Sequence, residues 1–235
     1  MCPTSGRRVP KEAYLVFITL EGIDGCGKST QARLLAAALE GAGHTVVTVR
    51  EPGGVDISEQ IRAILLDPAN STMSDTCELL LYAAARAQVV HEVIAPALAA
   101  GSVVVCDRFF DSTTAYQGFA GSSTREDADA ANALAVGDFR PDLTFVFDID
   151  PAAAAARRAE RAGGPDRMEA KGLAFQERVA EGFRTIAREE PGRVRLVDAT
   201  QPVDAVFACV LAELAHAGLA IDAASARAAL LSVGA

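Results

Sequence analysis

A glycine-rich segment near the N-terminus has the residue types and spacing of a phosphate-binding loop. Residues 22–29 read Gly-Ile-Asp-Gly-Cys-Gly-Lys-Ser, which fits GxxxxGK(S/T), and they lie between an apolar run and a stretch with apolar residues at helical spacing. In such a loop, backbone N–H groups converge on phosphate oxygens, the lysine reaches the β- and γ-phosphates, and the serine hydroxyl can ligate Mg²⁺. We therefore predict that the loop binds a nucleotide, with Lys28 on its phosphates and Ser29 on the metal.

An acid and an arginine follow a later apolar run. Asp107 and Arg108 come directly after residues 102–106, which read as a buried strand. Ligands gather at the carboxyl ends of strands in open parallel sheets. An aspartate there can hold the Mg²⁺ shell or orient a nucleophile, and an arginine can clamp a phosphate through two hydrogen bonds. As a surface ion pair the two residues would carry no function, so this interpretation depends on the phosphate loop lying beside them.

Cations also gather around a flexible stretch in the second half of the chain. The run Gly-Gly-Pro at 163–165 has arginines on both sides: Arg157, Arg158, Arg161 and Arg167. Phosphoryl transfer needs positive charge on the migrating group and exclusion of water, and a lid that bears arginines supplies both when it closes. The alternative is a solvated helix face with ion pairs between residues four apart.

The predicted elements that carry these residues alternate between strands and helices. Short apolar runs predict strands at 15–20, 45–49, 102–106, 143–147 and 194–197. Helical spacing predicts helices at 28–40, 58–66, 76–100, 125–136, 151–161, 169–190 and 202–217, with Ser58 capping the second and Pro96 kinking the third. Strands that are apolar on both sides belong in a sheet covered on both faces. We predict an α/β fold of the P-loop NTPase type, with a five-stranded parallel sheet between two layers of helices.

Length, charge and cysteine usage narrow the class of protein. The chain has 235 residues, which we divide into a loose extension at 1–12, one domain at 13–217 and an Ala-rich extension at 218–235. The net charge of −9 argues against sequence-independent binding to the phosphates of nucleic acid polymers. The five cysteines lie far apart without metal-ligand spacing, and no apolar run is long enough to span a membrane. We therefore expect a cytoplasmic protein with reduced thiols.

Four segments, in their order and spacing, resemble bacterial thymidylate kinase. They are residues 20–30 (LEGIDGCGKST), 50–54 (REPGG), 107–109 (DRF) and 114–118 (TAYQG), within a resemblance that covers about residues 14–215. The resemblance implies transfer of the γ-phosphate of ATP to dTMP, giving dTDP and ADP, with Mg²⁺ as cofactor. It also implies a homodimer of subunits with a parallel sheet.

At the phosphate end of the site, the resemblance assigns roles to the loop and to residues at the strand ends. The ATP-binding residues are Gly22, Ile23, Asp24, Gly25, Cys26, Gly27, Lys28, Ser29 and Thr30. Asp24 would also face the acceptor nucleotide near its sugar and phosphate. Arg108 would grip the dTMP phosphate, and Asp107 would organise Mg²⁺ together with Ser29. Lys28, Asp24 and Asp107 are accordingly predicted catalytic residues, while Glu51 and Arg62, eleven residues later, belong to the predicted dTMP site.

At the base end, the family pattern places an aromatic residue four positions before an arginine, here Tyr82 and Arg86. Tyr82 would stack on thymine, although the family usually has phenylalanine there and the extra hydroxyl needs a partner. Arg86 would donate to thymine O4 and so favour thymine over cytosine. Thr113 and Gln117 match the positions that address the base edge, and Tyr116 matches the one that crowds the sugar and favours deoxyribose. Without the resemblance, Tyr82 reads as a core aromatic and Arg86 as a solvated helix cation.

The resemblance also bears on the catalytic arginine. Thymidylate kinases carry it either within the phosphate loop, at the position of Gly25, or in the lid. This chain resembles the second kind, with a lid at about residues 157–168 and with Arg158 and Arg161 as predicted catalytic residues. The lid spacing before residues 166–169 differs slightly from the family pattern, so the choice among the lid arginines stays open.

Two other functions use a phosphate loop. A deoxynucleoside kinase phosphorylates a neutral hydroxyl and needs a general base rather than a second phosphate clamp, and Arg50, Arg62 and Arg108 favour an acceptor that already bears a phosphate. A nucleotide switch protein would bind rather than make product, but the chain lacks an NKxD motif and has no DxxG outside the phosphate loop. The prediction is a dTMP kinase that acts on two small molecules and binds neither nucleic acid polymers nor membranes.

Overall fold

The computed structural model describes residues 17–159 and 166–234, so the extension at 1–12, the first two residues of the predicted first strand and Arg161 lie outside the described residues. Five parallel strands form one sheet in the order β2-β3-β1-β4-β5. The strands are β1 (Phe17–Glu21), β2 (Val46–Arg50), β3 (Val103–Asp107), β4 (Leu143–Asp148) and β5 (Val194–Asp198). Each begins and ends within two residues of its predicted range, and the predicted α/β class with a five-stranded parallel sheet is confirmed.

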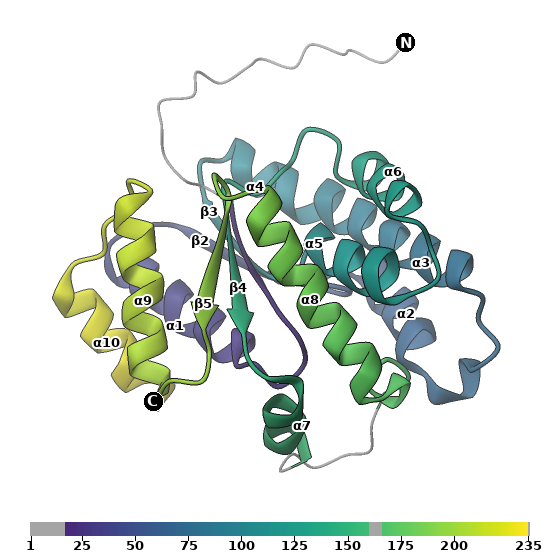
Figure 1. Ribbon diagram of the computed structural model, residues 1–235. Coiled ribbons are helices and arrows are strands. Elements are labelled where there is room, and N and C mark those ends of the chain that lie inside the picture. The colour runs from purple at the N-terminus through teal and green to yellow at the C-terminus, as the bar shows by residue number, and fades with distance from the viewer. Residues whose placement is uncertain (1–16, 160–165, 235) are drawn as a thin grey trace, which may run out of the picture.

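Helices connect the strands and cover both faces of the sheet. They are α1 (Lys28–Gly41), α2 (Asp56–Leu66), α3 (Asp75–Val89), α4 (Ala95–Ala99), α5 (Phe110–Thr113), α6 (Arg125–Val136), α7 (Pro151–Ala159), α8 (Leu173–Glu189), α9 (Val203–His216) and α10 (Ala223–Val233). Figure 1 shows α1, α9 and α10 on one side of the sheet and α3, α5, α6 and α8 on the other, with α7 below the carboxyl ends of β1 and β4. Within the described ranges, no helix is long and apolar enough to cross a membrane.

The central strand explains why the sheet is apolar on both faces. All of β1 is buried, and in the neighbouring β3 only Asp107 is partly exposed. Phe17 and Val104 pack with α3 and α4, whereas Ile18, Leu20 and Val105 belong to the cluster that contains the apolar face of α1. Burial on both sides leaves the carboxyl ends of these strands as the place where the chain presents polar groups.

Three predicted helices differ from the structure. Ser58 does not cap α2, because the helix begins two residues earlier at Asp56; its hydroxyl is buried and donates to the Ala85 carbonyl at 2.7 Å. The helix predicted at 76–100 is interrupted before Pro96 rather than at it, by a π-helical segment, η2 (Val90–Ile94), in front of α4. A proline cannot donate to the carbonyl four residues earlier and clashes with it, so the disturbance falls in the preceding turn.

The third difference lies after the lid. The helix predicted at 169–190 is split by Gly172, whose φ of 83° ends a short 3₁₀ turn, η4 (Glu169–Lys171), before α8 begins. The helix predicted at 151–161 is described as far as Ala159. One helical region was not predicted at all. At 110–120, α5 continues into the π-helical segment η3 (Thr114–Ala120).

The C-terminal segment set apart at 218–235 contains α10, which packs along α1. Asp222 caps α10 by accepting hydrogen bonds from the backbone N–H groups of Ala224 at 3.0 Å and Ser225 at 2.9 Å. Ala229 is buried in the cluster that contains the apolar face of α1, and Ser225 lies against Gly41, where a side chain would crowd it. The outer layer on this face of the sheet is therefore two helices deep.

Candidate active site

The glycine-rich loop joins β1 directly to α1, as its motif predicts. Gly25 and Gly27 take φ values of 91° and 95°, a region that other residues rarely adopt, so the chain reverses tightly between strand and helix. Gly27 is the N-cap of α1 and offers no side chain to the helix, which leaves the first-turn N–H groups available to an anion. Lys28 is buried, with its Nζ 3.4 Å from the Ile23 carbonyl oxygen and 3.6 Å from Asp24 Oδ1.

Helix α7 lies directly against this loop at Gly25. A Cβ atom placed on Gly25 would collide with the backbone carbonyl of Ala154 in α7. Glycine is therefore required at this position for the close approach of the two backbones, in addition to its positive φ. An arginine at this point of the loop would not fit beneath α7 in this arrangement, which is consistent with the prediction that a catalytic arginine comes from the lid.

Ser29 and Asp107 meet where the start of α1 faces the end of β3. The Ser29 hydroxyl donates to Asp107 Oδ2 at 2.5 Å, while Asp107 Oδ1 is buried and has no hydrogen-bond partner among the described residues. An unpaired buried carboxylate oxygen is costly unless a cation or water satisfies it. Mg²⁺ prefers oxygen ligands and is usually bound by one or two protein groups plus phosphates and water. Ser29 and Asp107 together offer oxygen ligands of the kind that Mg²⁺ prefers.

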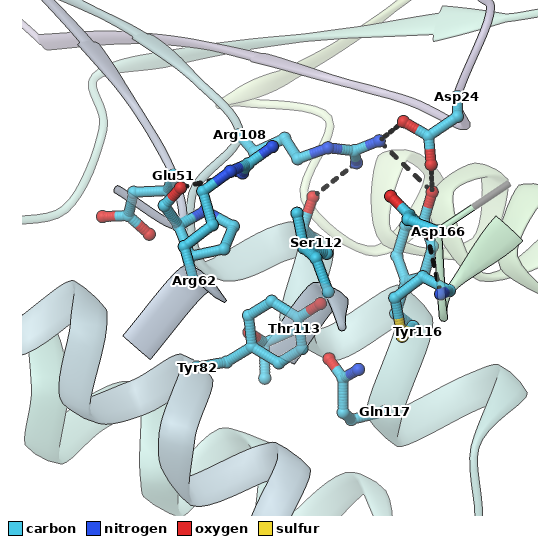
Figure 2. A pocket seen from close by; sticks show the side chains of 13 residues that line it. Asp24, Glu51, Arg62, Tyr82, Arg108, Ser112, Thr113, Tyr116, Gln117 and Asp166 are labelled. Carbon is cyan, nitrogen blue, oxygen red and sulfur yellow. Dashed lines mark hydrogen bonds and ion pairs between the residues drawn. The ribbon is translucent and has the colours of Figure 1, made fainter. Parts of the chain in front are cut away.

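Arg108 turns back from the end of β3 into the site. Its φ of 71° makes it the one non-glycine residue with positive φ in the described part of the chain, a conformation that costs free energy and is found at functional turns. Its guanidinium donates to the Gly22 carbonyl at 2.9 Å. It also donates to Ser112 Oγ at 3.0 Å and to Asp24 Oδ1 at 2.7 Å (Figure 2). Because five donors are held in a fixed fork, the side chain is oriented before any ligand arrives.

A buried carboxylate holds this turn from below. Glu21 Oε1 accepts from the backbone N–H groups of Phe109 at 2.7 Å and Ser112 at 3.2 Å, and Oε2 accepts from the Ser112 hydroxyl at 2.5 Å. Burial and the nearby charge of Asp111 raise the pKa of Glu21 to about 7 against the opposing effect of the Ser112 hydrogen bond. Glu21 was not among the predicted site residues, although its place directly before the glycine-rich loop is a signal for it.

Asp24 is the ionic partner of both cations at this end of the site. Burial alone would raise the pKa of its carboxyl, but the charges of Arg108 and Lys28 hold that pKa well below its ordinary value. The Tyr116 hydroxyl lies 3.5 Å from Asp24 Oδ2 and 3.3 Å from the Arg108 guanidinium, and its ring packs against Phe175 and Phe183. An ionised carboxylate thus lies between the phosphate loop and the adjoining pocket.

That pocket is where the structure gathers the predicted dTMP-binding residues. All of them except Arg86 line it, together with Asp24, Pro52, Leu66, Ser112, Asp166 and Met168; the predicted members are Glu51, Arg62, Tyr82, Arg108, Thr113, Tyr116 and Gln117. Figure 2 shows Tyr82, Thr113 and Gln117 together at one end and the Arg108 guanidinium at the other. The pocket therefore pairs a cationic end with an end that offers an aromatic ring, a hydroxyl and an amide.

Arg86 lies behind the pocket instead of on its wall. Its guanidinium is 2% exposed, and it donates to Glu51 Oε2 at 2.7 Å, to Asn132 Oδ1 at 2.9 Å and to the Phe109 carbonyl at 3.1 Å. Burial raises the pKa of Glu51 to about 7, although the charge of Arg86 opposes this shift. In this structure Arg86 joins Glu51 and Asn132 to the carbonyl of Phe109, the residue after Arg108, and its predicted contact with thymine O4 stays a prediction.

Tyr82 and Arg62 complete the two ends of the pocket. Arg62 NH1 donates to the Pro52 carbonyl at 2.9 Å, which holds its guanidinium near the cationic end. The Tyr82 ring is half-buried, and burial raises the pKa of its hydroxyl above the ordinary value. That hydroxyl has no hydrogen bond to any residue described in the structure. The expected hydrogen-bond partner of the Tyr82 hydroxyl is therefore not among these residues.

The lid arginines differ in what they touch. Arg158 Nε lies 3.5 Å from Glu169 Oε1, and its charge contributes to the lowered pKa of Asp24, whereas Arg157 points away and donates to the Ala199 carbonyl at 3.0 Å. Arg167 donates from Nε to the Leu65 carbonyl at 2.6 Å and from NH1 to Glu78. Of these arginines, Arg158 lowers the pKa of Asp24 at the phosphate end, alongside Arg108 and Lys28.

Three comparisons with known proteins point to one family. The family model described as "Thymidylate kinase" matches residues 20–210. A protein named "Thymidylate kinase" from Geobacter sulfurreducens is 52% identical over 199 residues, which cover 83% of this chain and 93% of that protein. One of the same name from Trichlorobacter lovleyi is 48% identical over 209 residues, covering 85% and 99%. The crystal structure of thymidylate kinase from Ehrlichia chaffeensis is similar with a TM-score of 0.69 at 34% identity, covering 85% of this chain and 98% of that one.

Proposed function

The chain belongs to the thymidylate kinase family, and from this premise we propose that it transfers the γ-phosphate of ATP to dTMP, giving dTDP and ADP. The observation that carries the proposal is the position of the pocket. It opens beside the phosphate loop: Asp24 belongs to both, and Arg108 of the pocket wall donates to Asp24 and to the Gly22 carbonyl of the loop. A donor phosphate on the loop and an acceptor phosphate at the cationic end of the pocket would therefore meet.

The donor side of the mechanism rests on the loop and on α1. We assign ATP binding to residues 22–30, with the loop and first-turn N–H groups and Lys28 around the phosphates. Mg²⁺ is proposed at Ser29 and Asp107, supported by the unpaired Asp107 Oδ1. When bound there, Mg²⁺ would neutralise charge on the β- and γ-phosphates.

On the acceptor side, positioning and charge do the work. Arg108 and Arg62 are proposed to hold the dTMP phosphate, and Arg158 and Arg161 to add positive charge when the lid closes. A phosphate oxygen of dTMP is already a competent nucleophile at neutral pH, so no side chain has to remove a proton. Asp24, between Lys28 and Arg108, orients both cations for an in-line transfer.

The base end would recognise thymine and the sugar. Tyr82 is proposed to stack on the base, Thr113 and Gln117 to address its edge, and Tyr116 to crowd the position of a ribose 2′-hydroxyl. Arg86 supports Glu51 of the pocket wall from behind through their 2.7 Å ion pair. Thr113 Oγ1 is buried without a partner among the described residues, as expected of a group reserved for a ligand.

The direct test is the identity and stoichiometry of the products. Purified protein with ATP, Mg²⁺ and dTMP should form ADP and dTDP in equal amounts, resolved by ion-exchange chromatography. ATP with thymidine in place of dTMP is the matched reaction that lacks the acceptor phosphate, and it should give no new nucleotide. Phosphorylation of thymidine but not dTMP would move the protein to the nucleoside kinases, and slow ATP hydrolysis without a new nucleotide would indicate a switch protein.

A homodimer is part of the proposal, and an apolar face supports it. Large hydrophobic side chains are exposed on α2, α3 and α6: Ile57 (49%), Ile64 (46%), Leu80 (58%) and Leu134 (89%). Figure 1 shows these helices side by side, with α3 packed against both others. Exposed apolar side chains on neighbouring helices are typical of a subunit interface, and a second copy would cover them.

Light scattering after size exclusion tests this interface. The wild type should have twice the chain mass of 24.5 kDa, and Leu134→Asp should shift it towards the monomer because a charge would be buried in the interface. Leu196→Asp changes an equally apolar side chain, 50% exposed on β5 at the opposite edge, and should leave the mass unchanged. A monomeric wild type would refute the dimer.

We also propose that the protein is located in the cytoplasm. The four cysteines in the described residues are all free thiols, and two of them, Cys26 and Cys106, are buried. Reduced cysteines are typical of proteins in reducing compartments.

A further inference from the structure

Glu78 is a buried carboxylate at the meeting point of three elements, and neither the phosphate loop nor the pocket wall contains it. It lies on α3 one turn before Tyr82, and its side chain is 3% exposed. Its oxygens accept from Gln117 of η3 and from two cations, Arg167 at the end of the lid and Lys171 just after it. A carboxylate this deeply buried needs such partners, and four hydrogen bonds satisfy it.

The contact with Gln117 determines which way the amide faces. Gln117 Nε2 donates to Glu78 Oε1 at 2.8 Å. An ionised carboxylate can only accept hydrogen bonds, so the NH₂ group of the amide must face it and the amide oxygen must face the other way. Figure 2 shows that oxygen on the side of Tyr82 and Thr113, and it accepts no hydrogen bond from the residues that the structure describes.

The surroundings keep Glu78 ionised at neutral pH. Burial would raise the pKa of its carboxyl, but the Gln117 hydrogen bond and the Lys171 and Arg167 contacts bring that pKa below its ordinary value. Lys171 Nζ lies 3.0 Å and 3.1 Å from the two oxygens, and Arg167 NH1 lies 2.5 Å from Oε2. The two cations thus take the oxygen sites that Gln117 leaves, and the charge that orients the amide persists.

An amide oxygen of Gln117 that is fixed towards the pocket distinguishes pyrimidines with a hydrogen-bond donor at N3 from those with an acceptor there. Thymine and uracil carry an N–H donor at N3, whereas cytosine has an acceptor there. A glutamine that is free to turn by 180° would serve either base, because its amide offers a donor on one side and an acceptor on the other. A glutamine held with its oxygen towards the pocket favours the base with the donor and leaves cytosine facing an unpaired acceptor.

We propose that Glu78 is a positioning residue that fixes the amide of Gln117 with its oxygen towards the pocket, and thereby makes the site select a pyrimidine with an N3–H donor over cytosine. This inference rests on the proposed function, since it concerns the acceptor base of the same site. Glu78 acts through Gln117 and does not touch the base.

The test compares kcat/KM for dTMP and dCMP, with saturating ATP and Mg²⁺, in the wild type and in Glu78→Gln. The variant preserves the shape of the side chain but can donate as well as accept, so it frees Gln117 to turn. The ratio of the two kcat/KM values should fall by about ten-fold, the loss expected for one oriented hydrogen bond, mostly through a higher KM for dTMP and a lower KM for dCMP. Glu78→Asp keeps the negative charge on a shorter side chain and should lower the ratio less. It replaces Glu78→Gln in the test if that variant folds poorly.

Two further variants separate positioning from general support of the fold. In Gln117→Ala the ratio should already be low, and adding Glu78→Gln should not lower it again, because Glu78 acts through Gln117. Asp111→Asn is the matched control: Asp111 is equally buried and paired with Arg193 at 2.7 Å, but it does not line the pocket. It should lower thermal stability without changing the ratio.

The possible outcomes distinguish this inference from the proposed function. A Glu78→Gln variant that loses activity equally on both nucleotides, as a structural residue would, overturns the inference while dTMP phosphorylation by the wild type stands. Additive effects of the Glu78 and Gln117 changes on the ratio also overturn it. A wild type that does not phosphorylate dTMP at all would overturn the proposed function itself.

Discussion

At the phosphate end of the site the backbone does most of the positioning, whereas at the base end side chains position one another across several elements. The loop at 22–27 and the turn at Arg108 are held by glycine conformations, by a helix N-terminus and by Glu21 beneath them. Tyr82, Gln117 and Glu78 come from α3 and η3 and depend on contacts between helices. The phosphate end should therefore set the rate of transfer, and the base end should set the choice of acceptor.

The largest effect should come from removing the lysine of the loop. Lys28→Ala should lower kcat by at least about 10²-fold, because it deletes a positioned charge that stabilises the transferring phosphoryl group. The preference for dTMP over dCMP should be unchanged, since Lys28 does not line the pocket. Steady-state assays with both nucleotides measure the two quantities, and near-normal turnover in this variant would refute the assignment of the loop.

A smaller effect should appear in the pH dependence of stability at the phosphate end. The pKa of Glu21 is raised to about 7 in the folded protein from an ordinary value of 4.5, so the folded state binds the extra proton between these pH values. The free energy of unfolding should fall as pH rises through this window, with a contribution from Glu21 of up to about 1.4 kcal/mol per pH unit. Glu21→Gln cannot ionise, so its stability relative to the wild type should increase from pH 4.5 to pH 7.

Urea unfolding at several pH values between 4.5 and 7.5 measures this difference. Glu126→Gln, an exposed glutamate in the first turn of α6, is the control and should give a curve parallel to that of the wild type. Parallel curves for Glu21→Gln as well would contradict the account of how the Arg108 turn is held.

The same contrast explains how much of the site the sequence could predict. The phosphate end is encoded in short contiguous segments, so the motif at 22–29 and the pair after β3 predict its residues and their meeting place. The sheet is predictable for a similar reason, because five nearly continuous apolar runs fit only buried parallel strands.

The base end depends on contacts between residues far apart in the sequence. Arg86 was predicted to donate to thymine O4, but nothing in the sequence indicated that Glu51 and Asn132, 35 and 46 residues away, would hold it behind the pocket wall. Glu78 was missed, although it lies four residues before Tyr82 and therefore on the same face of α3. The segment at 110–120 was not predicted as helical because it is short, rich in aromatic and β-branched residues and partly π-helical.

One comparison tests the separation of the two ends most directly: kcat/KM for dTMP and for dCMP in the wild type, Lys28→Ala and Gln117→Ala, measured with radiolabelled ATP so that slow transfer is detected. The account predicts that Lys28→Ala lowers both values by a common factor of at least about 10² and leaves their ratio unchanged. It predicts that Gln117→Ala lowers the ratio by about ten-fold with kcat for dTMP nearly preserved. A changed ratio in Lys28→Ala, or an unchanged ratio in Gln117→Ala, would contradict it.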